Sequence, residues 1–115
     1  MDFETRTVGD VTVIRLDEDR LDAAQAVRFK EAMRAVFDKT SGRIILDLSE
    51  VGFMDSSGLG ALVGVRKMLD GQDDLELVGL TPNVAKVFAL TRMNKVFTIH
   101  DTLDDTLDQP LRIAG

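Results

Sequence analysis

The chain has 115 residues, no cysteine and a hydrophobic fraction of 44%. One core of ordinary domain size fits this length, whereas a two-domain kinase or an α/β-hydrolase does not. The 20 acidic residues exceed the 14 lysines and arginines, which gives a net charge of −6. Because the basic residues are scattered among the acidic ones, direct nucleic-acid binding is not expected. We expect a single domain over residues 1–115.

The sequence carries no recognisable targeting or membrane-spanning segment. The opening segment Met1–Arg6 is acidic and lacks an apolar run of signal-peptide length. No stretch approaches the ~18 apolar residues that cross a membrane. The absence of cysteine excludes disulfides and cysteine-ligated zinc and agrees with a reducing compartment. These features predict a cytoplasmic protein without membrane insertion.

The first predicted elements are a hairpin and a helix. Polar and apolar residues alternate over Val11–Leu16, after a weaker extended run at Thr5–Val8 and a turn at Gly9-Asp10. This pattern predicts an N-terminal β-hairpin with a polar outer side. Asp22 then caps a helix in which apolar residues recur every three or four positions. That apolar stripe consists of Ala26, Phe29, Met33, Val36 and Phe37.

A central strand and a serine-containing turn follow. Ile44–Leu48 carries apolar residues on both faces, which is typical of a strand covered on both sides. The motif Asp55-Ser56-Ser57-Gly58 comes next, at what we expect to be the carboxyl end of that strand. A helix is predicted from about Ser57 to Leu69, ending at Asp70-Gly71.

The last third of the chain repeats the alternation of strand and helix. Strands are predicted at Leu75–Val78 and Val96–Ile99, with a helix between them that starts at Thr81-Pro82. The inward face of that helix consists of Val84, Val87 and Phe88. A short terminal helix begins at Asp101 and bears Leu103 and Leu107. The order predicts an α/β fold with a mixed, largely parallel sheet of four to five strands and about four helices.

The motif at residues 55–58 combines small polar side chains and glycine at a strand's carboxyl end, where ligands of open α/β sheets gather. Unpaired N–H groups and the positive macrodipole at a helix start suit a phosphate of about −1.5 to −2 charge. A phosphate on Ser56 would be held there without unfolding the domain. The simpler interpretation is that Asp55 or a serine only caps the helix, and from these residues alone it is the more common outcome.

The segment Leu46–Gly60, LDLSEVGFMDSSGLG, closely resembles the signature of STAS-domain anti-sigma factor antagonists. Arg20-Leu21-Asp22 and Pro82–Phe88 fall in the family's order, so the resemblance covers essentially the whole chain and implies a single STAS domain. Two positions depart from it. Asp19-Arg20 stands where the family usually has glycine before Leu-Asp, and Thr91-Arg92-Met93 stands where it often has Thr-Gly-Leu.

The resemblance implies a protein-binding switch rather than an enzyme. In this family the unphosphorylated antagonist binds an anti-sigma factor that is also a serine kinase, which frees the sigma factor. Phosphorylation of the first serine of the pair abolishes binding, and a PP2C-type phosphatase restores it. Carried over, the phosphoacceptor is Ser56. Asp55 would position its hydroxyl, Ser57 would cap the helix, and Gly58 would let the kinase backbone come close.

Helical geometry predicts a partner-binding surface on the same helix. Leu62, Val65 and Leu69 share one face, which we expect to lie on the sheet. The residues near the opposite, solvent-facing side are Leu59, Val63 and Lys67. This side extends away from the serine turn, so we expect it to contact the partner. Ordinary exposure of a single aliphatic residue, Val63, is the alternative.

Other classes of protein fit less well. A phospho-receiver domain needs a carboxylate cluster for Mg²⁺, but the first strand ends only in Asp17-Glu18, without matching threonine and lysine later. Ser56 lacks a Gly-x-Ser-x-Gly elbow, and we expect His100, the one histidine, to be a strand-end surface residue. No metal-ligand spacing or Gly-x-x-x-x-Gly-Lys motif occurs, so no cofactor is expected, although nucleotide binding stays undecided.

A second hypothesis keeps the fold and drops the sigma-factor role. STAS domains also resemble accessory subunits of lipid-transport ATPases and scaffolds of signalling assemblies, and both are interaction modules. The intact motif at residues 55–58 favours the phosphoswitch, whereas the identity of a copurifying partner would separate the two classes.

Overall fold

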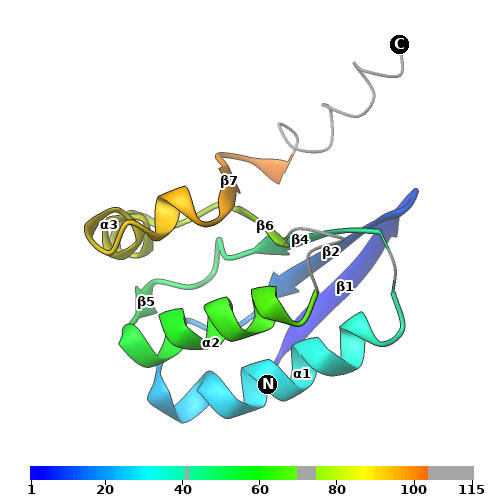
Figure 1. The fold of residues 1–115 in the computed structure, drawn as a ribbon, viewed down its shortest axis with the longest axis horizontal. Helices are drawn as coiled ribbons and strands as arrows, with labels where there is room; N and C mark the ends of the chain where they lie inside the picture. Colours follow the sequence, from blue (N-terminus) through cyan, green and yellow to red (C-terminus); the bar gives the residue numbers. More distant parts are fainter. Residues whose placement is uncertain (41, 70–74, 104–115) are drawn as a thin grey trace.

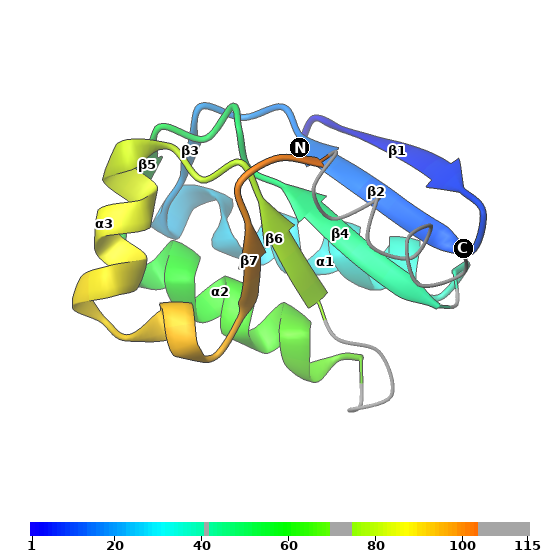
Figure 2. The ribbon, with the colours of Figure 1, turned by 90° about the horizontal axis from the view of Figure 1, so that it is seen from above.

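The computed structural model describes residues 1–40, 42–69 and 75–103. Its main sheet has five strands in the order β1-β2-β4-β6-β7 (Figure 2). The strands are β1 (Phe3–Val8), β2 (Val11–Leu16), β4 (Arg43–Asp47), β6 (Leu75–Val78) and β7 (Thr98–His100). β1 is antiparallel to β2, and all other neighbours are parallel. The predicted hairpin and the largely parallel sheet are therefore confirmed.

Helices cover one face of this sheet. The α-helices are α1 (Ala23–Phe37), α2 (Ser56–Lys67) and α3 (Pro82–Leu90). α1 and α2 lie side by side beneath the sheet, and α3 lies beside β5 (Phe53–Met54), which pairs with β3 (Arg20–Leu21) in a second, two-stranded sheet (Figure 1). The described residues contain three α-helices rather than the predicted four or so, and the expected terminal helix with Leu107 falls largely outside them.

The central strand β4 separates two apolar layers. Ile44 and Leu46 face the helices and belong to the main core, whereas Ile45 belongs to a smaller cluster on the opposite face. That smaller cluster consists of Val11, Val13, Ile45 and Val78, with Leu103 packed against it. Because successive side chains of a strand point to opposite faces, a strand that is apolar throughout must be covered on both sides. The prediction for this strand is confirmed.

The last strand lies later than the sequence predicts. It begins at Thr98 rather than Val96, because a 3-10 helix (Met93–Lys95) connects α3 to it. Phe97 is buried and packs edge to face on Phe88, with ring centres 5.8 Å apart and planes at 61°. The ring pair anchors the connection on the core, so hydrophobic residues before the strand serve packing rather than strand pairing.

α3 ends in a left-handed residue that is not glycine. Arg92 has φ 61° and ψ 19°, and within the described ranges it is the one non-glycine residue with a positive φ. It directly follows Thr91, the C-cap of α3. Helices often place glycine at this position after the C-cap. A Cβ in this conformation costs about 1–2 kcal/mol. The departure from Thr-Gly-Leu noted in the sequence is therefore a strained position.

We predict that Arg92→Gly raises the free energy of unfolding by about 0.5–1 kcal/mol, because the steric cost exceeds the extra unfolded-state entropy of glycine. Arg92→Ala is the matched control, since it removes the charge and keeps the Cβ, and we expect no comparable gain. Urea denaturation of the three proteins measures the difference. A gain from alanine equal to that from glycine would contradict strain as the cause.

Candidate functional site

The serine turn is held by the small sheet and by α3. After β4, the N–H of Gly52 donates to the carbonyl of Asp19 at 2.9 Å, and the hydroxyl of Thr81 donates to the carbonyl of Val51 at 2.7 Å. The chain then forms β5 before it reaches the turn. The sequence places the motif at the carboxyl end of the central strand; in the structure, residues 48–52 and the short strand β5 lie between β4 and the motif.

The carboxylate of Asp55 connects the N-termini of two helices. Its Oδ1 accepts a hydrogen bond from the N–H of Gly58 at 2.9 Å, and its Oδ2 accepts one from the N–H of Ala23 at 3.3 Å. Asp55 is therefore the N-cap of α2, and it also contacts the first residue of α1, whose own N-cap is Asp22. A carboxylate between two positive helix ends is stabilised by both.

The two serines occupy the first two positions of α2. Ser56 and Ser57 are both exposed, and the helix begins at Ser56, one residue earlier than predicted. The expectation that Ser57 caps the helix is wrong, because Asp55 performs that role. Since both oxygens of Asp55 accept from backbone N–H groups, the carboxylate fixes the turn, and a direct action on the Ser56 hydroxyl stays a prediction. The structure thus presents Ser56 on a fixed backbone.

Gly58 is required by packing within the chain. A Cβ at this position would lie 2.0 Å from the carbonyl oxygen of Leu21 and 3.1 Å from Cγ of Met54, two residues paired in the small sheet. Because Gly58 is buried against this backbone, the expectation that it admits the backbone of a kinase is wrong. Gly60, by contrast, is exposed, and a Cβ there would meet nothing within 4 Å.

The outer face of α2 differs from the predicted one at a single residue. Leu59 is only 8% exposed and belongs to the main core, so its assignment to the solvent-facing side is wrong. The buried arc of α2 is thus wider than the single stripe predicted for it. Val63 is half-buried and Lys67 is exposed. Ser56, Gly60, Val63 and Lys67 follow one another at helical spacing along the outer face.

Two residues beside the turn were missed by sequence reasoning. Phe53 is 44% exposed, and the guanidinium carbon of Arg20 lies 5.0 Å from the centre of its ring. Arg20 is the residue that stands where the family usually has glycine, and the register pairs it with Phe53. A phenylalanine in a strand-like segment is usually part of a core, so sequence alone carries no sign of its exposure. Phe53, three residues before Ser56 in the chain, adds an exposed apolar ring beside the turn, and Arg20 adds a positive charge over that ring.

The one histidine belongs to a charged cluster on the face of the main sheet that α1 and α2 do not cover. Nε2 of His100 lies 2.9 Å from Oε1 of Glu76, and Nη2 of Arg43 donates to the same oxygen at 2.7 Å. The hydrogen bond to Glu76 raises the pKa of the Arg43 guanidinium, although burial opposes this. His100 ends its strand as predicted, but its side chain is only 12% exposed, which corrects its assignment to the surface.

Neither a metal-binding cluster nor a membrane-spanning helix occurs in residues 1–40, 42–69 and 75–103. These residues contain no group of three or more histidine, cysteine, aspartate or glutamate side chains placed to hold a metal ion. None of the helices they form combines the length and the apolar character that a membrane span requires.

Comparison with known proteins assigns the family. The model of the STAS domain matches residues 2–106 of the chain. The chain belongs to the STAS-domain family. Among the relatives of this STAS domain, the anti-sigma-B factor antagonist of Listeria monocytogenes is 36% identical over 80 residues, which cover 69% of this chain and 70% of that protein.

Two solved structures share the fold of this STAS domain. The anti-sigma factor antagonist SpoIIAA in its unphosphorylated form is 26% identical, with a TM-score of 0.71, over 94% of this chain and 95% of that one. The Bacillus cell fate determinant SpoIIAA in the phosphorylated form is 25% identical, with a TM-score of 0.65, over 94% and 98%. The fold class predicted from the sequence is therefore confirmed.

Two glycines of α2 allow a matched test of the packing around the turn. We predict that Gly58→Ala lowers the free energy of unfolding by about 2 kcal/mol or more, because its Cβ meets the backbone of Leu21. Gly60→Ala should raise it by about 0.5–1 kcal/mol, since alanine favours the helix and open space surrounds its Cβ. Urea denaturation measures both values. Effects of the same sign would contradict the assigned packing.

Proposed function

We propose that this chain is an anti-sigma factor antagonist, and that phosphorylation of Ser56 switches its binding off. The observation that carries the proposal is the placement of Ser56: an exposed hydroxyl at the first residue of a helix whose start is fixed by a bridging carboxylate. A kinase needs such a hydroxyl to be accessible, and a switch needs its new charge to appear at a defined place.

The chain itself supplies the substrate hydroxyl, and its partners supply the chemistry. An anti-sigma factor that is also a serine kinase would transfer the γ-phosphoryl group of ATP to Oγ of Ser56, with the hydroxyl proton passing to a base of the kinase and ADP leaving. A PP2C-type phosphatase would hydrolyse the phosphoserine and restore the hydroxyl. In this scheme the chain is a regulatory protein and not an enzyme.

Electrostatics accounts for the loss of binding. A phosphate adds about −1.5 to −2 charge, which moves the net charge of the chain from −6 to about −8 at one turn. The neighbouring Asp55 carboxylate is already held by the N–H groups of Gly58 and Ala23. A partner interface over this turn would have to desolvate a dianion beside a fixed carboxylate, which is costly without a compensating cation. No large conformational change is needed.

The relatives support the same function. The Listeria relative is named for antagonism of an anti-sigma factor, and it aligns with more than two thirds of this chain. SpoIIAA, which shares the fold over nearly all of this chain, has been solved in unphosphorylated and phosphorylated forms. Antagonism of an anti-sigma factor and phosphorylation of the antagonist therefore both occur among proteins similar to this one.

The partner surface is proposed to run along the outer face of α2. It starts at Ser56, crosses the exposed backbone of Gly60 and includes Val63 and Lys67, which were predicted from the sequence. Phe53 extends it on the other side of the turn, because its ring is exposed and adjacent in the chain. A small apolar surface with a serine at its centre would be desolvated on binding, which makes it sensitive to one added charge.

The phosphoacceptor is tested by mass spectrometry of the intact protein after incubation with its cognate anti-sigma kinase and ATP. We predict that one phosphate is added to the wild-type chain and to Ser57→Ala, and that none is added to Ser56→Ala. Ser57 is the matched control because it is the next residue, equally a serine and also exposed. Phosphorylation of Ser56→Ala, or an unchanged mass of the wild type with an active kinase, would refute the switch.

Binding is tested with the same kinase in a titration without ATP. We predict that Ser56→Ala binds like the wild type, whereas Ser56→Asp and Val63→Asp each weaken binding about tenfold or more, because each places a charge in the desolvated surface. Lys39→Asp is the control for net charge, since Lys39 is exposed and follows α1 rather than lying on α2. Capture of a transporter ATPase by Ser56→Ala and Ser56→Asp alike would favour the accessory-subunit hypothesis.

A further inference from the structure

The outer side of β1 is an open strand edge. β1 is the first strand of the sheet, and no strand among the described residues pairs with its outer side (Figure 2). Its six residues pair one to one with β2, without a bulge or a proline, and all of them after Phe3 are exposed. Proteins usually block an edge of this length, because its free N–H and C=O groups are a template for another strand.

We propose that β1 pairs in antiparallel fashion with β1 of a second copy of this chain. The two five-stranded sheets then join at a two-fold axis that passes beside Thr5, and the contact is isologous. This inference concerns a surface other than the serine turn and does not depend on the function proposed for Ser56.

The backbone groups at the open edge fix the register. The carbonyl of Asp2 accepts from the N–H of Asp17 at 2.9 Å, so the backbone of Asp2 faces β2. Because these groups alternate along an antiparallel ladder, those of Phe3, Thr5 and Thr7 face outward. When two copies are centred on Thr5, each Thr5 lies opposite its counterpart, and each Phe3 lies opposite Thr7. All three outward-facing residues then form hydrogen-bonded pairs.

The same register brings opposite charges together. Glu4 of one copy lies opposite Arg6 of the other, and the two-fold axis repeats the contact. The side chain of Glu4 is 67% exposed, although one of its oxygens is 2.7 Å from Arg15. Arg6 has no ion-pair partner in the part of the chain that the structure describes. Directly opposite residues of this non-hydrogen-bonded type have Cα atoms ~4.5 Å apart, so their side chains meet.

Neighbouring registers are electrostatically worse. Centring the pair on Phe3 places Asp2 opposite Glu4, and centring it on Thr7 places Glu4 opposite Asp10, so both bring like charges together. Centring the pair on Glu4 or on Arg6 also brings outward-facing backbone groups together, but it places Glu4 opposite Glu4 or Arg6 opposite Arg6 at the axis, where the like charges repel. The register centred on Thr5 therefore satisfies both the backbone and the charges.

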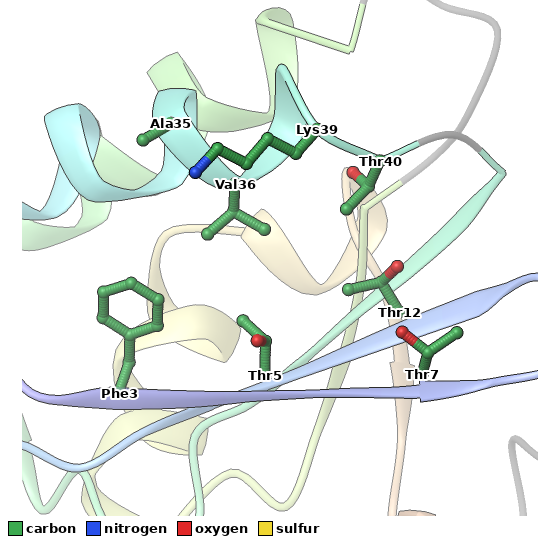
Figure 3. A pocket seen from close by; sticks show the side chains of 8 residues that line it. All are labelled: Phe3, Thr5, Thr7, Thr12, Ala35, Val36, Lys39 and Thr40. Carbon is green, nitrogen blue, oxygen red and sulfur yellow. The ribbon is translucent and has the colours of Figure 1, made fainter.

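A groove beneath β1 gives the partner's aromatic ring a place to lie. It has a volume of about 290 Å³ and lies between β1 and the C-terminal end of α1. Figure 3 shows Phe3, Thr5 and Thr7 extending from the strand towards Val36 and Thr40. The register places Phe3 of the partner subunit beside Thr7, at the end of the groove away from the chain's own Phe3. Burial of the two rings would remove apolar surface from water.

Charge reversal tests the dimer and its register together. Glu4→Arg and Arg6→Glu each create like-charged contacts, so we expect each variant alone to dimerise about tenfold more weakly than the wild type. An equimolar mixture of the two variants restores opposite charges at both contacts and should dimerise like the wild type. Analytical ultracentrifugation over a range of concentrations measures this. A wild type that stays monomeric at millimolar concentration, or a dimer that ignores the reversals, would overturn the proposal.

Cysteine cross-linking tests the position of the axis, because the natural chain has no cysteine. At the axis the Cα atoms of a hydrogen-bonded pair are ~5.5 Å apart, within the range of a disulfide. Thr5→Cys should therefore form a dimer under mild oxidation. Thr7→Cys, on the same face and also exposed, lies opposite Phe3 and should not form this dimer. Equal cross-linking of both, or none at Thr5→Cys, would refute the register, while the result for Ser56 would be unaffected.

Discussion

The carboxylate of Asp55 is the interaction on which the geometry of the site depends. Its two oxygens accept from the N–H of Gly58 in α2 and from the N–H of Ala23 in α1, so one side chain caps α2 and ties it to the first residue of α1, whose own N-cap is Asp22. It satisfies two of the backbone donors that every helix start leaves unpaired, and the positive ends of the two helices favour its charge. Ser56 follows directly, and its placement is inherited from this bridge.

A fixed turn suits a protein that acts by being modified. In the proposed switch, the partners of this small chain carry out the chemistry. What the chain contributes is a hydroxyl at a constant position beside a carboxylate whose oxygens are already occupied. A phosphate added there cannot be neutralised by its immediate neighbour. In the proposed switch, the effect of modification would therefore be local repulsion and desolvation, without any rearrangement of the close-packed core.

Sequence reasoning erred where contacts between distant segments decide the outcome. Leu59 was placed on the outer face because one narrow stripe of α2 was assigned to the sheet, but the buried arc of the helix is wider and includes Leu59. Gly58 was explained by an external partner, whereas the carbonyl of Leu21 occupies the space of its missing Cβ. Ser57 was expected to cap the helix, yet Asp55 was equally suited and its carboxylate reaches both helices. Each error concerns a contact between segments far apart in the chain.

The sequence by itself determined the order of the elements, the central strand and the location of the serine turn, because apolar periodicity, capping residues and glycines act over a few neighbouring residues. It also carried the family signature around Ser56. Only the tertiary structure decided that β5 precedes the turn, that Phe53 is exposed beside Arg20, and that no strand among the described residues pairs with the outer side of β1. These features depend on which strands pair and which faces are covered, and such long-range contacts leave no periodic trace in the chain.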